Sequence, residues 1–265
     1  MKLTILTENN AVPPFEAEHG LSMLLEIENL RILFDTGAGA VLAENSRLMK
    51  LDFSALDGII LSHGHYDHTG GLHLLPACTV WHAPGITQPH FSHHPGKPVR
   101  NLTMPEKCLE RLSQCQCHEI NSFTEIVPGI FLTGPIPRVS GEDCGGPFFS
   151  DVAGAVKDCI ADEQALLTAE GVLIQGCCHA GVINTLEFCR KAHPEIKVHT
   201  IVGGLHLLAA SEERLKQTAD YLKHYGTQKL YLLHCTGENA IAFLRKQLPE
   251  TAIFTPCVDG CTISL

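Results

Sequence analysis

The feature that most limits what this chain can fold into is a group of metal-ligand residues directly after a short apolar strand at 58–61. The group consists of His63, His65, Asp67 and His68. Imidazole nitrogens and carboxylate oxygens suit zinc, iron or manganese. At the end of a strand, His63 and His65 can point to one side, while Asp67 and His68 fall on the next turn. The loop therefore predicts ligands for two neighbouring metal ions rather than an ordinary solvated loop.

Two further histidines, His179 and His234, each follow an apolar strand and precede a helix. Strand ends of this kind gather at one edge of an open sheet, where functional sites form. Each residue alone could equally be an ordinary polar loop residue, but together with the histidine-rich loop they are predicted to bind metal. His206 has the same setting, and we expect it to act in catalysis or to contact substrate. Three protein ligands per ion leave positions for water and substrate.

The pattern of apolar residues predicts strands in succession first and strand–helix alternation later. The predicted strands are 3–7, 21–28, 31–34, 58–61, 79–82, 172–175, 199–202 and 229–233, with a hairpin turn at Glu28-Asn29. The predicted helices are 40–50, 105–113, one after His179 that contains Val182, Leu186 and Cys189, one between Ser211 and Gly226, and one to about residue 247. This succession indicates an α/β fold with the layers of an αββα sandwich.

The segment from about 84 to 159 differs in character because it is rich in proline, glycine and histidine and lacks a sustained apolar pattern. We interpret it as an insertion or lid on a single domain that spans residues 1–265. Three histidines in this segment, His90, His93 and His94, are expected at the surface.

Composition and charge exclude several classes of protein. Hydrophobic residues make up 45% of the chain, which is enough for a large core. The net charge of −10 argues against extended nucleic-acid binding. The N-terminal apolar stretch is too short for a signal peptide, and no segment reaches the roughly 18 apolar residues of a membrane helix. We therefore expect a cytoplasmic protein that does not bind membranes.

The twelve cysteines are expected to be reduced in that compartment. Most of them are interpreted as small buried hydrophobic residues. Cys177, Cys178 and Cys235 flank the predicted site, and we expect them to line it.

Motifs along nearly the whole chain resemble those of the metallo-β-lactamase superfamily, whose mark is the His-x-His-x-Asp-His loop. The resemblance is closer to one branch, the dihydropterin-ribofuranosylaminobenzene-phosphate synthase-like proteins. The motifs that carry it are residues 18–22, 35–37, 62–72, 134–138, 162–166, 176–181, 203–207 and 234–237. The resemblance implies a metallo-β-lactamase αββα sandwich with a dinuclear metal site.

The resemblance also implies how the ligands divide between two divalent ions. The first ion would be bound by His63, His65 and His179. The second ion would be bound by Asp67, His68 and His234. Zinc is the expected metal, with manganese or iron as alternatives.

One stretch departs from the pattern of the better-known hydrolases of the superfamily. Those enzymes usually place a bridging aspartate after the glycine at the strand end, whereas Cys177, Cys178 and His179 follow Gly176 in this chain. Glu163, like its neighbour Asp162, is expected to support the site by hydrogen bonds rather than to replace the missing ligand.

Two metal ions can activate water and hold a departing oxygen, which suits hydrolysis of esters or displacement of pyrophosphate by another nucleophile. The expected substrate is a small phosphate-bearing molecule, such as a pterin derivative. The helices after His179 and His234 can direct their N-terminal amides at an anion. Arg138 can bind phosphate through two N–H groups, or else is an ordinary surface arginine.

The remaining site residues receive separate roles. Asp67 and His206 are expected to take part in catalysis. His19 is expected at the rim of the site, where it would contact substrate together with His206. Asp35 is expected to fix a turn by hydrogen bonds rather than to bind metal.

Two alternatives to a hydrolase or transferase remain at this stage. One is a di-iron redox enzyme on the same fold, which would favour more carboxylate ligands. The other is a metal-binding protein without turnover. The sequence leaves the physiological substrate, the native metal and the oligomeric state open.

Overall fold

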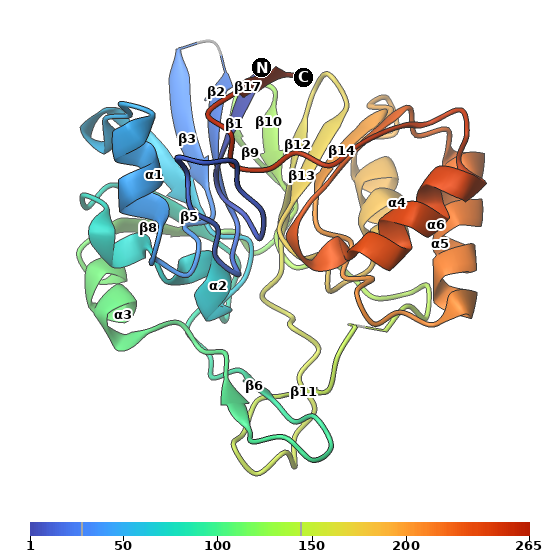
Figure 1. Ribbon diagram of the computed structural model, residues 1–265, viewed down its shortest axis with the longest axis horizontal. Helices are drawn as coiled ribbons and strands as arrows, with labels where there is room; N and C mark the ends of the chain where they lie inside the picture. Colours follow the sequence, from blue (N-terminus) through green and yellow to red (C-terminus); the bar gives the residue numbers. More distant parts are fainter. Residues whose placement is uncertain (28, 144) are drawn as a thin grey trace. The chain divides into compact units, whose positions relative to one another are not determined.

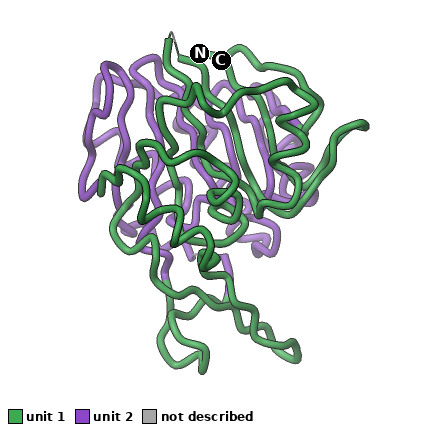
Figure 2. Tube along the Cα trace, turned by 90° about the vertical axis from the view of Figure 1, so that its left-hand side faces the viewer, with its two compact units in different colours: residues 1–119, 147–158, 257–265 green, residues 120–146, 159–256 purple. Residues whose placement is uncertain are grey.

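The computed structural model describes residues 1–27, 29–143 and 145–265. The described residues divide into two compact units, which Figure 2 draws in different colours. Unit 1 consists of Met1–Glu119, Pro147–Asp158 and Cys257–Leu265. Unit 2 consists of Ile120–Gly146 and Cys159–Pro256.

Unit 1 is built on a mixed sheet with the strand order β17-β1-β2-β3-β4-β5-β8. The strands are β1 (Lys2–Thr7), β2 (Ser22–Ile27), β3 (Leu30–Phe34), β4 (Gly58–Ile60), β5 (Thr79–His82), β8 (Gln116–Glu119) and β17 (Thr262–Ser264). Neighbouring strands from β17 to β3 pair antiparallel, and those from β3 to β8 pair in parallel. Parallel pairing brings the carboxyl ends of β3 and β4 side by side, and the histidine-rich loop begins there.

Helices pack against this sheet through apolar side chains. The helical segments of unit 1 are α1 (Leu42–Leu48), η1 (Phe53–Ala55), α2 (Tyr66–Thr69), η2 (Leu72–Leu74) and α3 (Glu106–Leu112). Leu42 of α1 and Leu112 of α3 join one hydrophobic cluster with Leu24, Leu33 and Ile59 of the sheet. Both helices lie on the same side of the sheet (Figure 1). Removal of these side chains from water holds the sheet and the helices together.

A small additional sheet belongs to the segment that was interpreted as an insertion. Its order is β11-β6-β7, with β6 (Phe91–Ser92), β7 (Arg100–Asn101) and β11 (Phe148–Phe149). In Figure 1 these strands form an arm that extends away from the main sheet of unit 1. The rest of the segment from 84 to 159 divides between the units, because α3 and β8 belong to unit 1 and residues 120–146 belong to unit 2. The single-domain organisation and the lid role stay predictions.

Unit 2 is built on a second mixed sheet with the order β16-β15-β14-β13-β12-β10-β9. The strands are β9 (Thr124–Val127), β10 (Ile130–Leu132), β12 (Ala165–Thr168), β13 (Val172–Gln175), β14 (Thr200–Gly203), β15 (Lys229–Leu232) and β16 (Ala252–Phe254). Strands β13, β14, β15 and β16 are parallel neighbours. Their carboxyl ends therefore lie at the same edge of the sheet.

Three helices cover one side of this sheet (Figure 1). They are α4 (Val182–Ala192), α5 (Glu212–Tyr225) and α6 (Glu238–Gln247), and the short segment η3 (His234–Thr236) precedes α6. Leu186, Leu222 and Leu244, one from each helix, are fully buried in a single hydrophobic cluster. Each helix follows a parallel strand, so each strand-to-helix loop opens at the edge of the sheet that carries the predicted ligands.

The structure confirms the α/β fold class and most of the predicted elements. Strands β5 and β13 coincide with the predicted 79–82 and 172–175. Helix α5 is capped as predicted, because the Ser211 hydroxyl accepts from the Arg214 amide and Gly226 adopts a left-handed conformation with φ 84°. The hairpin turn predicted at Glu28-Asn29 includes Glu28, which lies outside the described residues. No helix among the described residues combines the length and apolar character of a membrane span.

Candidate metal centre

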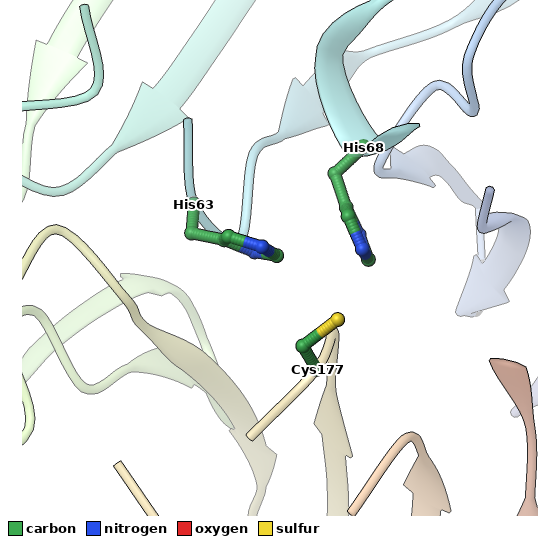
Figure 3. Close-up of side chains that lie close together, drawn as sticks. All are labelled: His63, His68 and Cys177. Carbon is green, nitrogen blue, oxygen red and sulfur yellow. The ribbon is translucent and has the colours of Figure 1, made fainter. Parts of the chain in front are cut away.

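The histidine-rich loop of unit 1 brings its potential ligands together in a buried cluster. His63, His65, Asp67 and His68 are each at most 6% exposed. The ring centroid of His63 lies 4.6 Å from that of His65 and 4.3 Å from that of His68. Figure 3 shows the imidazoles of His63 and His68 extending toward the same space from the loop after β4 and from α2. Packing several imidazoles this closely is typical of a metal site.

Asp35 supports the histidine-rich loop by hydrogen bonds. It follows β3 and therefore lies beside the end of β4, where the loop begins. Its carboxylate accepts from the Ser62 amide and hydroxyl at 2.7 Å each, and it is 2.7 Å from Nδ1 of His68. The side chain is fully buried, and its backbone is left-handed with φ 58°. His68 thus donates from Nδ1, so Nε2 is the ring atom that would bind a metal ion. The predicted hydrogen-bonding role of Asp35 is confirmed.

The same network selects the ligand nitrogen of His63. The Ser62 hydroxyl uses its hydrogen for Asp35, so it accepts from Nδ1 of His63 at 2.9 Å. His63 therefore also presents Nε2 as a lone pair. Burial, followed by the neighbouring His63, lowers the pKa of His65 well below its usual value. A neutral imidazole is the form that binds metal.

The prediction that His90 lies at the surface is wrong. His90 is only 3% exposed, and its Nδ1 lies 2.6 Å from a carboxylate oxygen of Asp158. Its ring is 5.0 Å from that of His65. His93 is partly buried against Phe149, whereas His94 is exposed as predicted. His90 is buried and His93 partly buried because residues 147–158 of unit 1 pack against them.

His19 and Asp67 form a contact at the outer part of the unit 1 cluster. Nε2 of His19 lies 3.1 Å from a carboxylate oxygen of Asp67. The His19 side chain is 53% exposed, whereas that of Asp67 is 9% exposed. The exposed ring agrees with the expected rim position, and contact with substrate stays a prediction.

Unit 2 places a second cluster at the carboxyl edge of its parallel strands. His179 follows β13, His206 follows β14 and His234 follows β15. The ring centroids of His179 and His206 are 4.3 Å apart. Cys178, His206 and His234 are left-handed, with φ of 63°, 45° and 50°. Non-glycine residues adopt this conformation rarely, and such strain collects at functional sites.

Cys177, which the sequence predicted to line the site, lies within the histidine cluster of unit 2. Within the described part of unit 2, the ligand atoms of Cys177, His179 and His206 all lie within 4.8 Å of one another. The same holds for Cys177, His234 and Cys235. Figure 3 draws Cys177 where it extends from the end of β13. The sequence signal for this position is the pair Gly176-Cys177 directly after β13.

The main chain of His179 is held from both sides. Glu163 accepts from the amides of His179 and Ala180 at 2.6 and 2.5 Å. Arg138 donates to the carbonyl oxygens of His179 and Cys159. Burial raises the pKa of Glu163 to about 7. The supporting role expected for Glu163 is confirmed, and a phosphate contact by Arg138 stays a prediction.

The amides at the N-terminus of α4 were predicted to face a substrate anion, and this prediction is wrong for the first amides of the helix. The amides of Ile183 and Asn184 donate instead to Glu142 at 3.0 and 3.2 Å. Glu142 is 8% exposed and also contacts the Ser140 hydroxyl at 3.0 Å. Glu142, in the chain segment between β10 and β11, thus supplies the acceptor oxygen for the first amides of this helix.

The prediction that most cysteines outside the site are buried is wrong for the described residues, because Cys78, Cys115 and Cys257 are only partly buried and Cys117, Cys159 and Cys261 are exposed. Cys108 and Cys189 are buried members of the hydrophobic clusters of unit 1 and unit 2. Burial raises the pKa of Cys189 to about 12, so its thiol stays protonated at neutral pH.

Comparison with known proteins agrees with these features. The metallo-β-lactamase superfamily matches residues 16–113. An uncharacterized protein of Methanocaldococcus jannaschii is 33% identical over 252 residues, which cover 91% of this chain and 93% of the relative. A 7,8-dihydropterin-6-methyl-4-(β-D-ribofuranosyl)-aminobenzene-5′-phosphate synthase of the same organism is 31% identical over 258 residues, covering 89% and 87%.

Solved structures show the same fold. The crystal structure of a metal-dependent hydrolase of the β-lactamase superfamily has a TM-score of 0.86 and 29% identity, and the match covers 100% of this chain and 99% of the other. A diphosphatase of the PhnP family has a TM-score of 0.56 at 13% identity over 100% of this chain and 97% of its own, which shows the fold alone. The chain therefore has the metallo-β-lactamase fold and belongs to the metallo-β-lactamase superfamily, in the branch of dihydropterin-ribofuranosylaminobenzene-phosphate synthase-like proteins.

Proposed function

We propose that this protein is a metal-dependent hydrolase or transferase that acts on a small phosphate-bearing molecule through a dinuclear site. The observation that carries the proposal is the buried cluster of His63, His65 and His68, in which Ser62 orients the ring of His63 and Asp35 orients the ring of His68. A fold alone does not imply an activity, but oriented and neutral imidazoles are what a metal ion requires.

The proposed ligands follow the assignment made from the sequence. One ion takes His63, His65 and His179. The other takes Asp67, His68 and His234. The buried clusters in unit 1 and unit 2 support this assignment, since each presents imidazole at the carboxyl ends of strands. Zinc is the proposed metal, because histidine-rich sites with open positions are typical of catalytic zinc.

The chemistry of the relatives supports a phosphate-bearing substrate. One relative is named as a synthase of a phosphorylated pterin compound, and a similar structure is named as a metal-dependent hydrolase. When bound, two metal ions activate water or stabilise the negative charge on a departing oxygen. A small molecule with a phosphoester or pyrophosphate group, including a pterin derivative, is therefore the proposed substrate class.

The protein side chains contribute orientation and proton transfer in this proposal. Asp67 is held by His19 and is proposed as a ligand with a catalytic role. His206 lies next to His179 and is proposed to contact substrate or to transfer a proton. A guanidinium has five N–H groups, so Arg138 can hold the main chain of His179 and still donate to phosphate.

The test is a turnover screen of the purified protein with zinc or manganese added. The substrates are phosphomonoesters, phosphodiesters and pyrophosphates of small molecules, including pterin phosphates, together with matched phosphate-free esters. We expect turnover of phosphate-bearing compounds that disappears after chelation and returns with added metal. Turnover restricted to phosphate-free esters, or unchanged by chelation, would contradict the proposal.

A further inference from the structure

We infer that Cys177 binds the metal centre through its sulfur and that this thiolate makes the centre selective for zinc over harder ions. The inference rests on the proposed metal centre and adds a ligand of a different chemical class. Cys177 belongs to both ligand groups of unit 2, one with His179 and His206 and one with His234 and Cys235. Its sulfur is therefore within reach of an ion at either histidine.

The two other cysteines near Cys177, Cys235 and Cys178, make different contacts, so Cys177 is the cysteine that we propose as the ligand. The Cys235 thiol donates to the carbonyl oxygen of Cys177 at 3.5 Å and thereby positions the Cys177 main chain. Gly204 allows this arrangement, because a Cβ atom there would lie 2.4 Å from the sulfur of Cys235. Close packing around Cys235 thus stabilises the turn that presents Cys177.

The adjacent Cys178 points into the interior of unit 2. Its left-handed backbone turns its side chain into the hydrophobic cluster, where the sulfur lies 3.8 Å from the Thr185 hydroxyl. Burial raises the pKa of the Cys178 thiol well above its usual value. Two consecutive cysteines of the same type therefore differ in environment, and Cys178 serves as a matched control.

The position of Cys177 in the chain also fits a ligand. It follows Gly176 at the carboxyl end of β13, and its neighbour by two residues is His179. It is only 3% exposed, so a metal ion bound there is protected from water. A thiolate is a soft ligand that favours zinc, whereas magnesium and calcium prefer oxygen ligands.

The experiment is X-ray absorption at the zinc edge on the zinc-loaded full-length protein. We expect a zinc–sulfur distance of about 2.3 Å in the original protein. The same signal is expected in Cys178→Ser, which leaves Cys177 in place. It is expected to be lost in Cys177→Ser. Replacement of zinc by cobalt gives a second readout, because a thiolate ligand adds a sulfur-to-cobalt charge-transfer absorption. We expect this absorption in the original protein and in Cys178→Ser, and we expect its loss in Cys177→Ser.

A second variant protects the test against misfolding. Cys177→Asp offers an oxygen ligand in the same place and is expected to bind zinc without the sulfur signal. Circular dichroism checks that both Cys177 variants are folded. A zinc–sulfur signal that persists in a folded Cys177 variant overturns the inference. Zinc bound by the original protein with only nitrogen and oxygen neighbours also overturns the inference but leaves the proposed function intact. Failure to bind zinc overturns the inference, and failure to bind either zinc or manganese overturns the proposed function as well.

Discussion

Asp35 illustrates how a single residue of this protein orients a proposed metal ligand by hydrogen bonds. One fully buried carboxylate accepts from the Ser62 amide, the Ser62 hydroxyl and His68. The partners are 27 and 33 residues away in sequence, so the arrangement depends on the parallel pairing of β3 with β4. An oriented imidazole binds metal more tightly because it loses less rotational freedom on binding.

We expect Asp35→Asn to weaken zinc binding by roughly 10- to 100-fold. Asparagine has a single acceptor oxygen and cannot satisfy all three partners. The same change should lower the free energy of unfolding by about 1–3 kcal/mol, since a buried donor loses its acceptor. Chelator competition and denaturant unfolding measure the two effects. Asp220→Asn, on the exposed side of α5, is the matched control and should change neither quantity.

We expect His65→Ala to lower the bound metal and to abolish turnover, because His65 is a proposed ligand that is buried in the unit 1 cluster. Metal analysis of the dialysed protein measures stoichiometry directly. His224→Ala, which removes an exposed histidine of α5, should leave it unchanged. Unaltered stoichiometry in the His65 variant would refute the ligand assignment.

Arg138→Ala is expected to raise the Michaelis constant for phosphate-bearing substrates. The residue also donates to the carbonyl oxygen of His179, so a purely positional role would reduce turnover of every substrate and weaken zinc binding. Steady-state kinetics on paired substrates with and without phosphate separate the two roles. An equal loss on both substrate types would count against the phosphate contact.

At the scale of secondary-structure elements, the strand-to-helix loops of unit 2 carry the candidate site. His179, His206 and His234 follow consecutive parallel strands, so one edge of the sheet collects all three. Helix α4 has its free amides satisfied by Glu142, which fixes the start of the helix directly after the His179 loop. The loop that contains Glu142 therefore contributes to the position of the site without containing a ligand.

Glu142 predicts a dependence of stability on pH. Burial raises the pKa of its carboxyl group, so the folded state holds this proton more tightly than the unfolded state. Between the unfolded and the raised folded pKa, the folded state binds more protons, and the free energy of unfolding falls as pH rises. Unfolding experiments from the usual glutamate pKa upward should show this decline. Glu142→Gln should flatten it, and an unchanged slope in that variant would disprove the assignment.

At the scale of the whole molecule, metal binding is expected to raise the free energy of unfolding, because the proposed ligands come from both unit 1 and unit 2. Binding to the folded state alone adds about 2.7 kcal/mol when free zinc is about 100 times the dissociation constant. For a chain of this size that amounts to a rise of roughly 5–10 °C in the unfolding temperature. Calorimetry with zinc and after chelation measures it. Magnesium is the control and should have little effect, and an equal zinc shift in His65→Ala would contradict the account.

Local sequence patterns predicted a large part of this protein. Strand β13 and the caps of α5 at Ser211 and Gly226 follow from apolar periodicity and short-range hydrogen bonds. The histidine-rich loop could be identified as a ligand cluster because its members lie within six residues of one another. Short strands such as β6 and β11 were missed, since two residues carry no periodic pattern and pair only with distant partners.

The sequence by itself determined the fold class, the histidine-rich loop and the strand ends that carry His179 and His234, because each depends on neighbours along the chain. Tertiary structure alone decided that Asp35 orients His68, that Glu142 caps α4, that His90 is buried and that Cys177 rather than Cys178 turns toward the histidines. These outcomes depend on which strand ends become neighbours and on the direction in which one left-handed residue turns a side chain. Residues far apart in the chain determine both, through the packing of each sheet.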